Sequence, residues 1–230
     1  MLKKTHAVDW GSDSPTPDQL KEFFAQIGSG RITKSRLQVF LCSDEEDISS
    51  ILKDWQKFYK ELFGLEIDFS KLVIPVKKKG FDRLIVVAPG MTPERLYGKC
   101  KELFPSWKWT NDNLDKIVIS ERTAKNSAYA VWFQNTVEAD ENLKNLSAYI
   151  LKDKNIPGIT LEERLLMELK YFKETGKHLD INNITLCAGS RCSDGSVPGV
   201  FWDDVELRVG WCGTGDCSGD LRAREAVLNS

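Results

Sequence analysis

The stretch Ser43–Gly64, SDEEDISSILKDWQKFYKELFG, carries the clearest helical pattern in the chain. Acidic residues crowd its start, where the dipole of a helix favours negative charge. From Ile48 onward the apolar side chains recur at steps of three and four residues, so they share one face of a helix. Gly64 ends the pattern. The sequence therefore predicts a long amphipathic helix that opens with a capping box at Ser43–Glu46.

Short apolar runs follow this helix and predict a sheet. Leu72–Ile74 and Arg83–Val87 flank the charged turn Lys77–Gly80, a pattern typical of a β-hairpin. A capping box at Thr160–Glu163 opens a helix that Gly176 closes. The other elements expected in this part of the chain are helices at 93–104 and 135–154 and strands at 116–119 and 129–133.

The two ends of the chain predict different secondary structure. At the N-terminal end, Thr16, Pro17 and Gln19 form a third capping box and start a helix to about residue 27, followed by a short helix at 33–41. The C-terminal end is rich in strand-like runs, at 184–187, 199–202 and 206–211, with a last short helix at 221–228. Strands and helices thus interleave irregularly.

This order predicts an α+β fold, with a mixed or mainly antiparallel sheet, amphipathic helices packed on it and a β-rich C-terminal region. Residues 1–43 are expected to form a helical hairpin packed on a main domain of residues 44–230. The cysteine-containing β-rich tail covers residues 184–217.

Composition narrows the class of protein. The 230 residues carry a formal net charge of −2, which gives no general attraction to nucleic acid or anionic lipid. No apolar run reaches membrane length, and no hydrophobic segment follows the basic start as a signal peptide requires. We therefore expect a cytoplasmic protein without a membrane partner, whose six cysteines are thiols or metal ligands.

Three stretches resemble a group of uncharacterised bacterial proteins: Phe81–Ala88, Tyr129–Phe133 and Glu174–Asp180. The resemblance covers most of the chain after about residue 30. It implies a bacterial origin and one shared architecture, and it implies no activity because the group has none assigned. The four cysteines of the tail are not part of the resemblance.

Those four cysteines are the most distinctive chemical feature. Cys187 and Cys192 are separated by four residues, and so are Cys212 and Cys217. Two short glycine-containing loops after strands could offer four thiolates to one structural zinc ion. The spacing weakens this hypothesis, since paired zinc ligands usually have two residues between them. Alternatively, Cys187 packs as a small apolar residue and the others are incidental thiols.

The tail also contains six acidic residues: Asp194, Asp203, Asp204, Glu206, Asp216 and Asp220. Carboxylates on adjacent loops could hold a metal ion and support hydrolysis. Turns also favour aspartate and glycine for reasons of backbone geometry alone. The sequence leaves both interpretations open and favours the turns.

A nucleic-acid interface is the remaining possibility. The order helix, Gly28–Arg31, helix loosely resembles a helix-turn-helix, which would place Lys34, Arg36 and Gln38 on the second helix. Lys77–Lys79 and Trp107–Trp109 add cations and aromatic rings. A helical hairpin, and a strand with both tryptophans buried and Lys108 outside, explain the same residues and are favoured.

No catalytic motif is found, so the sequence leaves enzymatic activity open and leans against it. The favoured hypothesis is a non-catalytic binding or interaction protein with a macromolecular partner rather than a small-molecule substrate. The alternatives are a nucleic-acid-associated protein and a metal-dependent hydrolase that uses the tail carboxylates. Structural zinc is the cofactor that the sequence suggests.

Overall fold

The computed structural model of the chain describes residues 15–37 and 45–229. It divides into two compact units, Met1–Cys42 and Ser43–Ser230. In the first unit, α1 spans Pro17–Gly28, and the predicted capping box is present because Thr16 and Gln19 exchange hydrogen bonds of 2.8 and 3.3 Å. A second helical segment starts at residue 34. The end of that predicted helix and the predicted cap at Ser43 lie outside the described residues.

In the second unit, the long amphipathic helix is confirmed as α3, Glu45–Phe63. Its buried aromatic side chains anchor it to strand β1, Arg83–Val87. The Trp55 indole donates to the carbonyl of Leu84 at 3.2 Å, and the Tyr59 hydroxyl donates to that of Val86 at 2.7 Å. The apolar face of α3 therefore packs against the main chain of β1 as well as its side chains.

The predicted hairpin between residues 72–74 and β1 is wrong. Residues 72–74 form no strand, and β1 pairs antiparallel with β4, Tyr129–Phe133, in the register Ile85↔Val131. Four of the five residues in each strand are buried. A strand this apolar has to be covered on both faces, which a local hairpin with an exposed charged turn does not provide.

A five-stranded mixed sheet has the order β2-β8-β7-β5-β9. Both edge strands run parallel to their neighbours, and the inner pairs are antiparallel. A separate antiparallel pair joins β3 to β6. The mixed sheet expected of the α+β fold is confirmed. The strand bounds are β2 Ser106–Lys108, β3 Val118–Ser120, β5 Ile184–Leu186, β6 Ser190–Cys192, β7 Val197–Trp202, β8 Leu207–Cys212 and β9 Leu221–Ala223.

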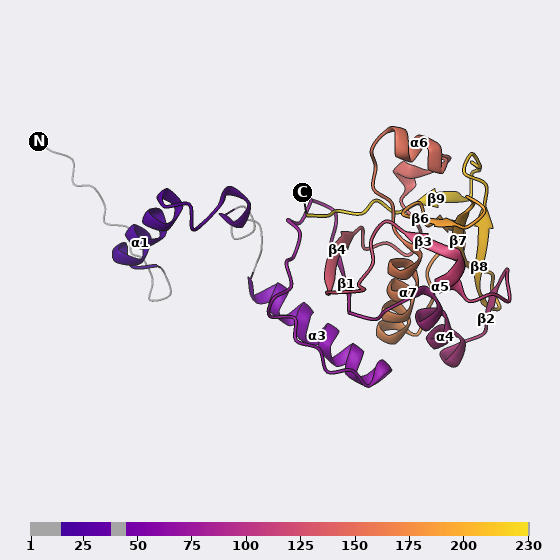
Figure 1. The fold of residues 1–230 in the computed structure, drawn as a ribbon, viewed down its shortest axis with the longest axis horizontal. Helices are drawn as coiled ribbons and strands as arrows, with labels where there is room; N and C mark the ends of the chain where they lie inside the picture. Colours follow the sequence, from indigo (N-terminus) through magenta and orange to yellow (C-terminus); the bar gives the residue numbers. More distant parts are fainter. Residues whose placement is uncertain (1–14, 38–44, 230) are drawn as a thin grey trace, which may run out of the picture. The chain divides into compact units, whose positions relative to one another are not determined.

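Helix α7, Leu161–Thr175, lies at the centre of this unit, between the β1–β4 pair and the five-stranded sheet (Figure 1). Its capping box at Thr160 and its stop at Gly176, which has a φ of 67°, are as predicted. All of its residues from 161 to 170 are buried, charged ones included. Helix α4, Pro93–Leu103, which begins at the predicted Pro93, and the short α5, Leu114–Ile117, accompany it.

Ion pairs replace hydrophobic contacts in part of this core. The buried Asp180 accepts a hydrogen bond from Arg164 of α7 at 2.9 Å and one from Arg224 at 2.7 Å. Arg164 also pairs with Glu168 one turn along the helix at 2.8 Å. The network joins α7 to the segment before β5 and the segment after β9, and each buried charge in it has an opposite charge as a partner.

Other predictions of local structure are wrong. Residues 135–154 form no single helix, because the 3-10 turn η1 at Glu141–Leu143 is followed by a new cap at Ser147 and α6 at Ala148–Asp153. Residues 221–228 form β9 and isolated bridges instead of a helix. Of the two tryptophans expected to be buried, Trp107 is 43% exposed and Trp109 is half-buried against the core. Lys108, expected outside, turns inward to Glu94 at 2.9 Å. No helix in the described ranges is long and apolar enough to cross a membrane.

Candidate functional site

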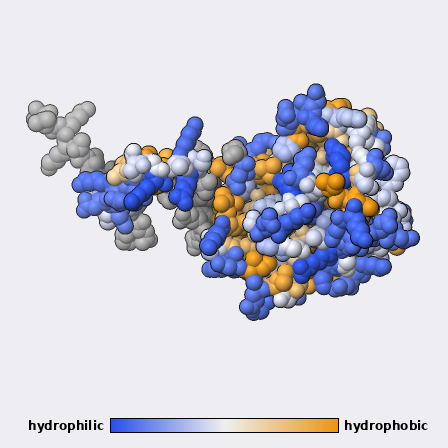
Figure 2. Space-filling view, in the orientation of Figure 1, coloured by the Kyte–Doolittle hydropathy of each residue, from blue (hydrophilic) through white to orange (hydrophobic). Residues whose placement is uncertain are grey.

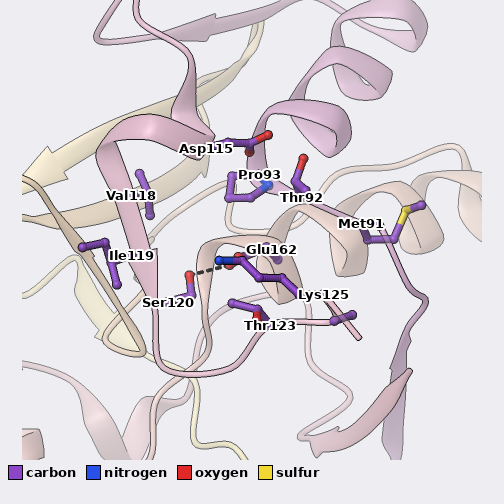
Figure 3. Close-up of a pocket in the computed structure, with 12 residues that line it drawn as sticks. Met91, Thr92, Pro93, Asp115, Val118, Ile119, Ser120, Thr123, Lys125 and Glu162 are labelled. Carbon is purple, nitrogen blue, oxygen red and sulfur yellow. Dashed lines mark hydrogen bonds between the residues drawn. The ribbon is translucent and has the colours of Figure 1, made fainter. Parts of the chain in front are cut away.

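A pocket of about 380 Å³ opens where three segments meet the start of α7. Its walls are residues 90–93 at the start of α4, residues 118–120 of β3 and residues 123–125, together with Asp115 and Glu162. Figure 3 shows Ser120 on β3 pointing toward Glu162 on α7. Side chains from elements far apart in sequence thus converge on one cavity.

Hydrogen bonds at the mouth hold the walls in place. The amide of Glu94, in the first turn of α4, donates to Asp115 of α5 at 2.9 Å, and the Glu94 carboxylate accepts the amide of Leu114 at 2.7 Å. On the other side, the amide of Gly90 donates to the carbonyl of Ala124 at 3.2 Å. The φ of 76° at Gly90 favours glycine there.

Glu162 is the buried acid of this pocket. It is 5% exposed, and the Ser120 hydroxyl donates to its Oε2 at 2.5 Å. Burial raises the pKa of Glu162 to about 7, against the opposing effect of the Ser120 hydrogen bond, and the charge of Glu163 raises it further. No ion pair among the described residues includes Glu162. The carboxyl group is therefore partly protonated near neutral pH and has no cation of its own.

Glu163, the next residue, has the opposite environment. Arg122 holds both of its oxygens with two hydrogen bonds of 2.8 Å. The Tyr129 hydroxyl adds a hydrogen bond at 3.0 Å, and the Thr160 amide, as part of the capping box, adds one at 2.8 Å. Its four hydrogen bonds are all used inside the fold. Glu163 is thus a structural carboxylate, and Glu162 is the one that faces the cavity.

A line of hydrogen bonds gives Ser120 a fixed orientation. The Leu161 amide donates to the Ser190 hydroxyl at 2.9 Å, and the Ser190 and Ser120 hydroxyl oxygens lie 2.7 Å apart. Because Ser120 donates to Glu162, Ser190 donates to Ser120. The strand pair β3–β6 and the first turn of α7 therefore act together in presenting Glu162 to the pocket.

Both polar and apolar groups line the opening. Asp115, Thr123 and Lys125 line it and are exposed. Ile119 of β3 is 73% exposed, and on the face drawn in Figure 2 hydrophobic surface gathers in the region of α5 and β3. Such a mixture of one buried acid, a few polar groups and an apolar rim is typical of a binding site.

The four tail cysteines lie in different environments. Cys187 and Cys192 are buried and Cys217 is exposed, and all are free thiols together with the half-buried Cys212. Burial raises the pKa of Cys187 and of Cys192, and that of Cys212 to about 11, which favours the thiol over the thiolate that zinc needs. Within the described residues, which include all four cysteines, no group of three potential metal ligands is present. The zinc hypothesis gains no support.

The tail carboxylates mostly fasten their own turns. Asp194 accepts the amide of Ser196 at 2.9 Å, Asp203 that of Glu206 at 3.1 Å and Asp216 that of Gly213 at 2.6 Å. Asp220 accepts the hydroxyl of Ser218 at 2.5 Å. These are the turn contacts that the sequence also suggested, and they give no support to a hydrolytic metal site.

Of the residues predicted to contact nucleic acid, Lys34 and Arg36 are exposed on the helical segment that starts at residue 34. The Arg36 guanidinium donates to the carbonyl of Arg31 at 3.4 Å. Gln38 lies outside the described residues. Nucleic-acid binding through this segment stays a prediction.

Neither Glu162 nor Ser120 was among the residues predicted to form a site. The pattern of Thr160–Glu163 places Glu162 within the capping box, although the box needs only Thr160 and Glu163. A usable signal is the second glutamate itself, because the capping box needs one glutamate and leaves the other without a role in the cap. Ser120 carries no sequence signal, since its role depends on contacts with Ser190 and Glu162 across the fold.

No known protein family, no curated protein and no solved structure matches the chain.

Proposed function

We propose that this chain is a non-catalytic binding protein whose pocket receives a cationic group of its partner at Glu162. One observation carries the proposal: Glu162 is a buried carboxyl that faces a cavity and takes part in no ion pair of the described residues. A buried acid without a counter-ion is unfavourable to the fold when ionised. A bound cation would remove that cost and add a charge-assisted hydrogen bond.

The hydrogen bonds of the neighbouring Glu163 support a binding role for Glu162. Its four internal hydrogen bonds already hold the start of α7, so Glu162 is not needed for that purpose. The positive charge of Lys125 at the rim weakens the attraction of the pocket for further cations, and the negative charge of Asp115 strengthens that attraction. The pocket is therefore suited to a single ammonium or guanidinium group on an apolar stem.

The test uses n-butylammonium as the probe and two-dimensional NMR of the full chain as the readout. We expect amide shifts at Ser120, Glu162 and Ala124, with affinity that increases between pH 6 and pH 8 as Glu162 ionises. Glu162→Gln should abolish the shifts. The matched control is Glu121→Gln, which removes an acid with a 64% exposed side chain from the segment after β3. Absence of shifts, or equal shifts with Glu162→Gln, would overturn the proposal.

A further inference from the structure

Within residues 15–37 and 45–229, strand β3 is paired along one edge, to β6, with Ile119 opposite Arg191. The Glu121 amide donates to the carbonyl of Gly189 at 2.9 Å, and the Ser193 amide donates to the carbonyl of Ile117 at 2.8 Å. The main-chain groups of the odd-numbered residues of this segment therefore point toward β6. In an antiparallel ladder the residues between them turn their main-chain groups to the opposite edge. The main-chain groups of Val118 and Ser120 thus point away from β6.

This second edge borders the pocket, because Val118, Ile119 and Ser120 all line it. The Val118 amide closes α5 by donating to Leu114. The carbonyl of Val118 and the amide and carbonyl of Ser120 enter none of the turn, loop or cap hydrogen bonds found among the described residues. An unpaired strand edge is a template for a further strand.

We propose that an extended peptide segment adds to this edge of β3 and places a lysine or arginine side chain against Glu162. The inference rests on the proposed function and names the partner. Directly opposed residues of two paired strands share a face of the sheet. Since the Ser120 side chain points to Glu162, at 2.5 Å, the peptide residue opposite Ser120 directs its side chain to Glu162 as well.

The neighbouring positions fit an extended peptide. The residue opposite Ile119 lies on the other face, where Ile119 is 73% exposed and offers an apolar contact. A partner of alternating apolar and basic residues therefore matches both faces. Main-chain hydrogen bonds would supply affinity for any extended segment, and Glu162 would select the cation.

The experiment measures calorimetric binding of blocked pentapeptides to the full chain. The parent peptide has threonine at both ends, valine at the second and fourth positions and lysine at the centre; a matched peptide has norleucine in place of lysine. We expect the lysine peptide to bind at least tenfold more tightly. Glu162→Gln should remove this difference, and Glu121→Gln should keep it.

Methylation of the peptide amides tests the strand pairing. Alternate amides of an added strand face β3, so N-methylation on one alternate set should weaken binding at least tenfold, while the other set should be tolerated. Affinity for the lysine peptide should increase from pH 6 to pH 8. The charge of Glu163 acts on Glu162, Asp115 and Lys125 line the same pocket, and Tyr129 and Cys187 are buried titratable groups on which the charge of Glu162 acts. The pKa of Glu162 lies inside this pH range.

The outcomes separate the two proposals. Binding of n-butylammonium with no gain for the peptide, or equal sensitivity of both amide sets, would overturn strand addition and leave the pocket proposal standing. Equal affinity for the lysine and norleucine peptides would overturn the cationic assignment. If neither probe binds, both proposals fail. The protein could instead form a dimer that the peptide does not dissociate, with the free edge of β3 protected from amide hydrogen exchange. That result would identify a second copy of the chain as the occupant of the edge and would overturn the peptide proposal.

Discussion

Glu162 and Glu163 are neighbours in sequence with opposite environments, and their titration should differ accordingly. The pKa of Glu162 is raised to about 7 by burial, well above the value of about 4.3 of a free glutamate. Between these values the unfolded chain is ionised while the folded protein stays protonated at this site. The stability that this group contributes is therefore full below about pH 4 and is lost as the pH rises through 7.

We expect Glu162→Gln to remove this loss. Relative to the unsubstituted protein, its free energy of unfolding should increase by about 2 kcal/mol more at pH 8 than at pH 5, as measured by urea denaturation. Asp140, whose pKa burial raises to about 6, titrates in the same range in both proteins and cancels from the comparison. Glu163→Gln is the control and should destabilise at both pH values. An equal effect of Glu162→Gln at the two pH values would contradict the prediction.

The tail cysteines allow a second comparison at this scale. Cys187 is fully buried in the hydrophobic core, whereas Cys217 is exposed. Cys187→Ser should cost about 1–3 kcal/mol because a hydroxyl replaces an apolar contact, and Cys217→Ser should stay within about 0.5 kcal/mol. Thermal unfolding measures both. Equal losses, accompanied by stoichiometric zinc in protein purified without chelator, would instead support the zinc hypothesis.

At the scale of elements, the hydroxyl of Tyr59 is one of the two side-chain groups described above that bond α3 to β1. Tyr59 is fully buried; its hydroxyl donates to the carbonyl of Val86 at 2.7 Å and accepts the amide of Ala88 at 3.1 Å. Tyr59→Phe leaves both main-chain groups without this partner. We expect a loss of about 1–3 kcal/mol in the free energy of unfolding. Tyr149→Phe, at a side chain that is 65% exposed, should change stability little.

An element can be predicted when the pattern that specifies it lies within its own sequence. The helices α1, α3, α4 and α7 carry caps or apolar stripes within their own sequence, and these were recognised. The pairing of β1 with β4 is a choice between distant segments, and no local pattern encodes it. Strand β6, Ser190–Cys192, is not predicted because it contains no β-branched or aromatic residue of the kind that favours a strand.

At the scale of the whole molecule, one aspartate ties three parts of the second unit together. Asp180 is paired with Arg164 of α7 and with Arg224 after β9, and all three are fully buried. Asp180→Asn would leave Arg224 without the counter-charge described above, and Arg164 with Glu168 alone. We expect a loss of about 3–5 kcal/mol by urea denaturation.

Backbone geometry is not expected to cause this loss, since asparagine tolerates the φ of 54° at position 180. Asp204→Asn is the matched control, because Asp204 is exposed and has a similar φ of 70°. Stability unchanged by Asp180→Asn would show that the network contributes nothing net. The α+β class followed from composition and the order of elements, whereas these buried charges were unforeseen, because only tertiary packing makes Arg164 and Arg224 interior residues.

The segment after β9 has a consequence for biosynthesis. Val227 bridges to Trp132 of β4, and β9 pairs in parallel with β5. The second unit cannot complete its core before residues 221–227 have left the ribosome, although the apolar strands β1 and β4 emerge much earlier. At about 5–20 residues per second these strands wait for several seconds. During that interval their unpaired edges are exposed to chaperones and to aggregation.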